Sequence, residues 1–196
     1  MAAAPDRQLW CIDRGIDICH QLRLVPHYLA GDFDSCHPDS LNWAKAMGIR
    51  IDTFNRNKDF TDTQAVLTKA KEENTYTILT GALGNRFDHT FSTLLSTAHQ
   101  GIKGCLADEQ ETIFLLYPGE TVSLTMDIRP KAISLLPLTA TVQNVTTQGL
   151  VWELDRAELS RTDPYAISNE LKPDSNEFRI EISTGILALY ILTKEM

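Results

Sequence analysis

The stretch Gly31-Asp32-Phe33-Asp34-Ser35 follows a short apolar run, Tyr28 to Ala30, and precedes Pro38. The apolar run predicts a strand, and proline at position 38 suits the first turn of a helix. In extended backbone, residues i and i+2 point to the same side, so Asp32 and Asp34 can converge on one point. Converging carboxylates favour a cation between them. The same residue types are also common in plain polar turns, and this stretch alone is equally compatible with that reading.

Strands and helices alternate on both sides of this stretch. The expected strands are 9–12, 28–30, 50–54, 75–80 and 103–107, and the expected helices are 15–22, 38–47, 61–73 and 85–99. The clearest helix opens with Thr61 and Gln64 at the spacing of a capping box, and Asn85 is a plausible N-cap of the last one. Such alternation favours a mainly parallel sheet with helices on its faces.

The pattern changes after about Glu109. Six short β-rich runs follow, separated by glycine and proline: 113–117, 121–126, 132–136, 141–145, 178–182 and 186–191. The charged residues 155–163 are expected to form a surface loop. We therefore predict an α/β domain over residues 1–115 and an all-β domain, a small sandwich or barrel, over residues 116–196.

Composition narrows the class of protein. The 196 residues carry 26 acids against 18 bases, a net charge of −8, which argues against a nucleic-acid-binding surface. The sequence contains no apolar run of about 18 residues, so we expect no membrane-spanning helix, and the first residues lack the pattern of a signal peptide. The four cysteines form no C-x-x-C pair and are expected to be reduced thiols of a cytoplasmic protein.

Two further stretches follow expected strands, where open α/β sheets bind ligands. One is Lys58-Asp59-Phe60-Thr61-Asp62, and the other runs from Gly81 to His89 with glycine at 81 and 84. Glycine lets the backbone approach a ligand, a helix N-terminus offers N–H groups to an anion, and Arg86 suits phosphate. Each has a plainer reading: Asp62 as a first-turn acid, Asp88 as a partner of Arg86, His89 as a packed histidine. Together, the acids, the arginine and the glycines favour magnesium, polyphosphate and phosphoryl-type transfer.

Five segments in one order resemble the thiamine pyrophosphokinase family. They are Gly31–Ser35 (G-D-F-D-S), Lys58–Asp62 (K-D-x-T-D), Gly81–His89 (G-A-x-G-x-R-x-D-H), Gly149–Trp152 and Ser168–Glu170. The resemblance implies an N-terminal catalytic α/β domain, a C-terminal β-sandwich that binds thiamine, and a homodimer. It implies transfer of a pyrophosphoryl group from ATP to the thiamine hydroxyl, with Mg²⁺, giving thiamine diphosphate and AMP.

The resemblance also implies roles for individual residues. Asp32, Asp34 and Asp62 match the Mg²⁺ ligands, and with Arg86 and Asp88 they form the expected catalytic set. The residues expected near ATP are Asp13, Gly31, Asp59, Thr61, Gly81, Gly84 and Arg86. Ser168 and Asn169 match the thiamine-contacting segment. Either Asp62 or Asp88 could orient or deprotonate the hydroxyl, and Trp152 is either a ring that stacks on thiamine or a core residue.

The sequence departs from the family pattern at a few positions. Only eight residues precede Leu9, where the family has a further strand, so either the start is trimmed or the strand is dispensable. The family's D-G-G-A turn stands as Asp13-Arg14-Gly15-Ile16, where Arg14 would either narrow the nucleotide approach or contact phosphate. Asn85 and Thr93 replace a usual glycine and asparagine. The alternatives are a pyrophosphokinase for another alcohol, a catalytically impaired thiamine sensor, and a structural module.

Overall fold

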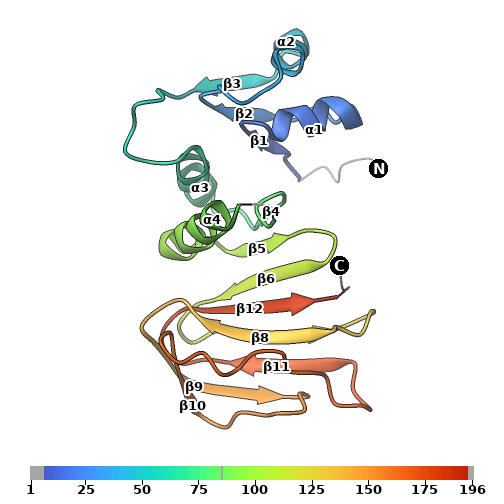
Figure 1. The fold of residues 1–196 in the computed structure, drawn as a ribbon, viewed down its shortest axis with the longest axis vertical. Helices are drawn as coiled ribbons and strands as arrows, with labels where there is room; N and C mark the ends of the chain where they lie inside the picture. The colour runs from blue at the N-terminus through green and yellow to red at the C-terminus, as the bar shows by residue number, and fades with distance from the viewer. Residues whose placement is uncertain (1–6, 85, 194–196) are drawn as a thin grey trace. The chain divides into compact units, whose positions relative to one another are not determined.

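The chain divides into two compact units, residues up to Glu73 and residues from Asn74 onwards. The structure is a computed structural model that describes residues 7–84 and 86–193, shown as a ribbon in Figure 1. We call the parts the N-terminal unit and the C-terminal unit. No helix within the described ranges is long and apolar enough to cross a membrane.

The N-terminal unit is built on a parallel sheet with the order β1-β2-β3. Its strands are β1 (Trp10–Ile12), β2 (Tyr28–Gly31) and β3 (Arg50–Thr53), and its helices are α1 (Gly15–Leu22), α2 (Pro38–Ala46) and α3 (Asp62–Glu72). The parallel pairing agrees with the prediction made from strand–helix alternation.

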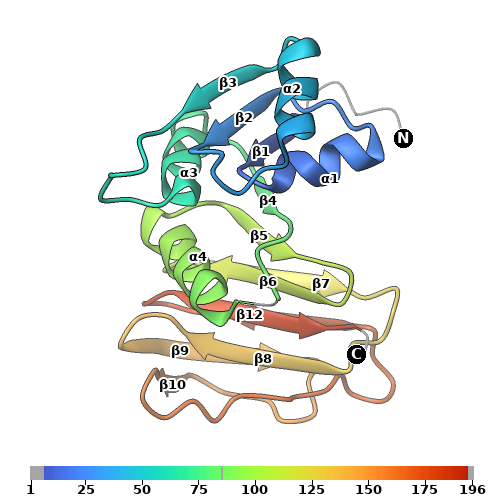
Figure 2. The same cartoon turned by 45° about the horizontal axis from the view of Figure 1, so that its top comes forward.

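Helices cover both faces of this sheet (Figure 2). On one face, Leu29 of β2 packs with Ile16 of α1 and Ala44 of α2. On the other face, Ala30 packs with Val66 of α3. Neighbouring residues of a strand point to opposite faces, which explains why the fully buried run from Tyr28 to Gly31 is apolar or small throughout.

The C-terminal unit holds two sheets and one helix, α4 (Phe87–Gln100). The five-stranded sheet has the order β4-β5-β6-β12-β8, with bounds β4 (Thr77–Leu79), β5 (Gly104–Ala107), β6 (Glu111–Leu116), β12 (Leu187–Leu192) and β8 (Ala132–Pro137). The β4–β5 pair is parallel, and the other pairs of this sheet are antiparallel. The four-stranded antiparallel sheet has the order β10-β9-β11-β7, with bounds β7 (Thr121–Thr125), β9 (Thr141–Gln148), β10 (Ala157–Ser160) and β11 (Glu177–Glu181).

The two sheets of the C-terminal unit share one hydrophobic core. Leu187 and Leu189 of β12 belong to the same buried cluster as Val145 of β9 and Ile180 of β11. Alternation of buried and exposed residues along β11 places one face of that strand in the core and the other in solvent. Packing of this kind is the sheet-on-sheet arrangement of a β-sandwich.

Two details of the elements differ from the sequence-based expectations, and the compact units divide at another point than the predicted domains. The compact units divide after Glu73 because β5 hydrogen-bonds to β6 within one sheet, while the domain boundary at 115/116 stays a prediction. For the same reason, β4 and β5 lie in the mixed sheet and not in the parallel one. The expected loop 155–163 contains β10, which pairs with β9 and buries Leu159. The proposed N-cap residue Asn85 lies outside the described residues.

Candidate active site

Acidic residues follow all three strands of the parallel sheet. Asp13 comes directly after β1, Asp32 and Asp34 follow β2, and Asp62 is the first residue of α3, the helix after β3. The carboxyl ends of parallel strands lie at one edge of a sheet, the usual ligand-binding edge of such folds. The N-terminal unit therefore gathers four of the predicted site residues at one edge.

Asp13 and Gly31 fit closely against each other. The Asp13 backbone N–H donates to the Ala30 carbonyl at 3.0 Å. A Cβ at position 31 would lie 1.9 Å from Asp13 Oδ1, and Gly31 has φ +153°. Glycine is needed at position 31 because only glycine leaves room for the Asp13 carboxylate.

The Asp13 carboxylate is poorly compensated. Its Oδ1 atom is buried and has no hydrogen-bond partner within the described ranges. Burial raises the pKa of Asp13 to about 6, with further increases from the carboxylates of Asp62 and Asp32, although the N–H groups of Phe33 and Asp32 act in the opposite direction. The Asp13 carboxylate is thus repelled by two other acids of this edge, an arrangement that a cation would relieve.

Asp62 is paired with Lys58, and both side chains are largely buried. Lys58 Nζ lies 3.2 Å from each Asp62 carboxylate oxygen, with 10% of the Lys58 side chain and 15% of the Asp62 side chain exposed. The geometry satisfies a hydrogen bond to Oδ2 and leaves Oδ1 without one. Lys58 Nζ also donates to the Asn55 carbonyl and lies over the Phe54 ring. The lysine therefore holds the loop that precedes α3 and supplies a counter-charge to Asp62.

Asp32 and Asp34 form the turn after β2. The Asp34 N–H donates to Asp32 Oδ1 at 3.1 Å, and Phe33 between them has φ +60°. Asp34 Oδ2 lies 3.0 Å from Arg56 Nη2, and both of these side chains are substantially exposed. Part of the plain turn reading is thus correct, since Asp32 stabilises the turn, while Asp34 remains accessible to an incoming cation.

The chemistry of these acids suits a hard cation such as Mg²⁺, which takes oxygen ligands. Two buried carboxylate oxygens, Asp13 Oδ1 and Asp62 Oδ1, lack hydrogen-bond partners in the part of the chain that the structure describes. Over the same residues, no group of three His, Cys, Asp or Glu side chains could hold a metal ion by itself. Mg²⁺ commonly uses one or two carboxylates together with substrate phosphates and water, so the donor set fits an ion that arrives with a polyphosphate.

The glycine-rich stretch belongs to the C-terminal unit. Gly81 and Gly84 have φ of +70° and +121°, and no atom lies within 4 Å of a Cβ built at either position. Arg86 is the N-cap of α4 without a side-chain cap bond. Its Nε donates to Asp88 Oδ1 at 3.1 Å, its Nη2 bonds the other oxygen, and this pair lowers the pKa of Asp88. The plain reading of Asp88 as a partner of Arg86 is what the structure shows, and His89 is exposed.

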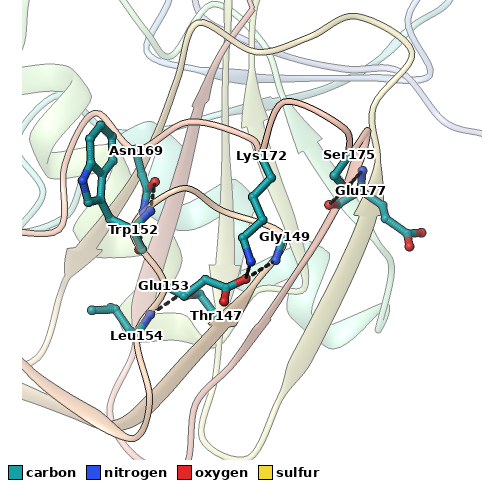
Figure 3. Close-up of polar contacts among 9 residues, drawn as sticks. All are labelled: Thr147, Gly149, Trp152, Glu153, Leu154, Asn169, Lys172, Ser175 and Glu177. Carbon is teal, nitrogen blue, oxygen red and sulfur yellow. Dashed lines mark hydrogen bonds and ion pairs between the residues drawn. The ribbon is translucent and has the colours of Figure 1, made fainter.

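Asn169 stands beside the turn that carries Trp152, again within the C-terminal unit (Figure 3), and Ser168 precedes it in the chain. Ser168 has φ +56°, and its N–H donates to Ser134 Oγ at 3.0 Å. Both polar ends of the Asn169 side-chain amide bond the backbone of Trp152. Trp152 is 61% exposed, so the core reading of this tryptophan is wrong and its ring is available to a ligand.

The remaining predicted residues either stand at the start of a helix or are exposed to solvent. Thr61 accepts from the Gln64 N–H at 3.1 Å, and Gln64 Oε1 accepts from the Thr61 N–H, so the capping box is present. Asp59 is exposed. Arg14 has φ −58° as the N-cap of α1 and a largely exposed side chain 4.0 Å from Asp17. That backbone conformation has no need of the family's glycine.

Sequence reasoning missed two groups near these residues. Arg56 pairs with Asp34, and Glu153 accepts from both Gly149 N–H and Lys172 Nζ at 2.7 Å. The position of Arg56 three residues before Asp59, a predicted ATP contact, was a weak signal. The Glu153–Lys172 pair spans 19 residues, and nothing in the local sequence indicates it.

Comparison with known proteins identifies the family. Residues 5–106 match the family described as "Thiamin pyrophosphokinase, catalytic domain". This chain belongs to the thiamin pyrophosphokinase family. Residues 121–187 match the family's second domain, "Thiamin pyrophosphokinase, vitamin B1 binding domain". The predicted resemblance is thereby confirmed, and the Trp152 turn and the Asn169 segment both fall within the second match.

Individual family members are similar over most of the chain. A thiamine pyrophosphokinase of Bacillus subtilis is 26% identical over 189 residues, which cover 94% of this chain and 87% of the relative. The crystal structure of a thiamin pyrophosphokinase from Geobacillus thermodenitrificans has 26% identity and a TM-score of 0.85, covering 98% of this chain and 89% of the other. Thiamine pyrophosphokinase 1 of rice (Oryza sativa subsp. japonica) is 26% identical over 165 residues, which cover 79% of this chain but 62% of the plant protein.

Proposed function

We propose that this chain is a thiamine pyrophosphokinase, which transfers the pyrophosphoryl group of ATP to the thiamine hydroxyl and releases AMP. The observation that carries the proposal is the set of acids at the carboxyl ends of β1, β2 and β3, within the match to the family's catalytic domain. Phosphoryl-type transfer depends mainly on positioning and on charge neutralisation. An acid-rich edge that can gather a cation and a polyphosphate meets the second requirement.

Asp32, Asp34 and Asp62 are the residues proposed to hold Mg²⁺, with Asp13 and Gly31 shaping the same edge. Bound Mg²⁺ would neutralise charge on the triphosphate. Lys58 fixes the Asp62 carboxylate before ligands arrive. Arg56 occupies Asp34 through an exposed ion pair, an interaction weak enough in water for a divalent cation to replace.

Either Asp62 or Asp88 is proposed to orient the thiamine hydroxyl. The Arg86 guanidinium holds the pKa of Asp88 below its ordinary value, which makes Asp88 a weaker proton acceptor. Asp88 then serves to hold the Arg86 fork, and Arg86 remains the proposed phosphate contact. Asp59, Thr61, Gly81 and Gly84 remain proposed parts of the ATP site.

Thiamine is proposed to bind against the segment 168–169 and the exposed ring of Trp152. A cationic thiazolium or an aromatic pyrimidine stacks well on an indole face. A homodimer in the cytoplasm, with no nucleic acid as partner, completes the proposal. The sensor alternative drew on Arg14, whose side chain is largely exposed, and the experiment below distinguishes it from the enzyme.

The decisive experiment measures AMP formation from ATP and Mg²⁺, with and without thiamine, using the purified full chain. Thiamine-dependent AMP together with thiamine diphosphate is expected. Binding of thiamine without AMP would instead favour a sensor. If neither binding nor turnover occurs, the substrate is wrong, and a panel of other alcohols, a pterin alcohol among them, should be assayed with the same ATP and Mg²⁺.

A further inference from the structure

The turn from Gly149 to Leu154 presents the exposed side chain of Trp152, yet its backbone is tightly held (Figure 3). Val151 N–H donates to the Glu170 carbonyl at 2.9 Å, and Lys172 N–H donates to the Gly149 carbonyl at 3.0 Å. At the end of the turn, Leu154 N–H donates to Thr147 Oγ1 at 2.8 Å. An exposed indole on a fixed backbone is a preorganised contact surface, because little conformational freedom of the chain is lost on binding.

Asn169 supplies the side-chain bonds at the tip of this turn. Its Oδ1 accepts from the N–H of Trp152 at 3.1 Å and from the N–H of Glu170 at 2.9 Å, and its Nδ2 donates to the Trp152 carbonyl at 2.7 Å. A side-chain amide offers two acceptor and two donor positions. Three of the four are therefore used, and the second N–H of the amide has no bond among the residues that the structure describes.

The backbone of Asn169 is fixed as firmly as its side chain. Its N–H donates to the Ile133 carbonyl at 2.9 Å, and its carbonyl accepts from the Ile133 N–H at 2.8 Å. Ile133 belongs to β8 and is fully buried. Asn169 thus connects the Trp152 backbone to the five-stranded sheet.

We propose that Asn169 is a positioning residue that acts on thiamine through Trp152, with its side-chain amide holding both polar backbone groups of that tryptophan. The inference rests on the proposed function, because it takes thiamine as the ligand of the Trp152 ring. It assigns to Asn169 a role different from a direct hydrogen bond to the substrate. The Glu153 carboxylate, bonded to Gly149 N–H and to Lys172 Nζ, fastens the other side of the same turn.

The test is a double-mutant cycle between Asn169→Asp and Trp152→Ala, read as the KM for thiamine and for ATP. Asn169→Asp keeps the acceptor Oδ1 and replaces the donor to the Trp152 carbonyl by a repelling oxygen. Trp152→Ala removes the ring and keeps the backbone groups that Asn169 binds. A matched control is Asn144→Asp, another asparagine of the same unit, whose Nδ2 bonds Ser183 Oγ at 2.9 Å.

Asn169→Asp should raise the KM for thiamine roughly tenfold, because the free energy lost is about that of one hydrogen bond. The KM for ATP and kcat should be nearly unchanged. In the Trp152→Ala background the same substitution should change the KM less than about twofold, because the ring through which it acts is gone. An equal rise in both backgrounds would show that Asn169 contacts thiamine directly, and the proposal would be wrong. Asn144→Asp should leave both KM values unchanged.

A second readout does not need turnover. In a chain whose tryptophan is reduced to Trp152 by Trp10→Phe and Trp43→Phe, Asn169→Asp should lower the fluorescence anisotropy of the indole and increase its quenching by acrylamide. Unchanged anisotropy would overturn the positioning role. If the wild-type chain forms no AMP with thiamine, the proposed function fails, and the anisotropy measurement still decides whether Asn169 holds the ring.

Discussion

Gly31 leaves room for the Asp13 carboxylate at the acidic edge because glycine has no side chain. An added methyl group would lie 1.9 Å from Asp13 Oδ1, and the backbone has φ +153°. We expect Gly31→Ala to lower the free energy of unfolding by about 3 kcal/mol, from overpacking and backbone strain together. Urea unfolding measures this. Gly48→Ala is the control: φ is +70°, no atom lies within 4 Å of the new Cβ, and the loss should be about 1 kcal/mol.

Asp34 is the most accessible acid of the proposed metal set. Its side chain is 44% exposed, and among the described residues its carboxylate forms an ion pair with Arg56 alone. Asp34→Asn should therefore leave the fold intact. Turnover should fall at least about a hundredfold, the usual scale for losing a preorganised charge. Steady-state AMP release, with melting curves as a check of folding, measures this. Asp39→Asn, at a solvent-facing acid in the first turn of α2, is the control; unchanged turnover in Asp34→Asn would remove this residue from the metal site.

At the scale of elements, the start of α3 joins helix stability to the position of Asp62. Thr61 and Gln64 satisfy each other's backbone N–H groups, and Asp62 is the next residue. Thr61→Ala should destabilise the chain by about 1 kcal/mol. It should also reduce turnover, because the backbone that positions the Asp62 carboxylate is no longer fixed by the cap. Thr61→Ser keeps the hydroxyl and should restore both. A loss of turnover that serine does not restore would mean that the threonine methyl group, and not the cap, is needed.

The turn between β9 and β10 gives a pH-dependent measurement. Lys172 and the Gly149 N–H lower the pKa of Glu153 from the ordinary value of 4.5. A depressed folded pKa means that the stabilisation is complete above the unfolded pKa and is lost as the pH falls through the folded pKa. An NMR titration should find the Glu153 pKa below 4.5 in the wild type and closer to that value in Lys172→Met. Lys45→Met, at a lysine of the other unit, should leave it unchanged.

At the scale of the whole molecule, the strand order predicts where the chain can be cut. β6 lies between β5 and β12, with Leu187 opposite Leu116 and Leu192 opposite Glu111. A fragment of residues 74–196 keeps every strand of both sheets of its unit and should unfold cooperatively. A fragment of residues 116–196 loses β6 and leaves β12 with an open edge, and should be poorly folded. Near-UV circular dichroism and amide hydrogen exchange compare the two; a well-ordered 116–196 fragment would contradict this.

Interactions between residues close in sequence were sufficient to predict most helices and strands of the N-terminal unit. The capping box at Thr61, proline at 38 and the apolar run at 28–30 act within a few residues, and the structure has each where it was expected. β10 was missed because Leu159 is its single deeply buried residue among polar neighbours. The division of the compact units after Glu73 was not predicted because strand pairing is non-local, and no pattern near Leu115 indicates that β6 pairs with residues about 75 positions later.

The candidate site was predictable in residue type and less so in contacts. The order of the acids and the strand ends indicated the edge that carries Asp13, Asp32, Asp34 and Asp62. Which cations pair with them depends on the path of the loops, so Arg56 was not predicted and Lys58 had no assigned role. Asn169 was expected from the resemblance to contact thiamine, but its amide bonds the Trp152 backbone, a contact between segments 17 residues apart that sequence spacing does not encode.

The central place of β12 in its sheet also bears on synthesis of the chain. Leu187–Leu192 is the last described strand, yet it stands between β6 and β8 and completes both ladders. During translation, β6 and β8 therefore emerge from the ribosome long before the strand that joins them, and the backbone N–H and C=O groups of their facing edges stay unpaired meanwhile. A nonsense codon shortly before Leu187 should yield an aggregating product or a chaperone-bound one, whereas a nonsense codon after Leu192 should release a chain able to close its sheet.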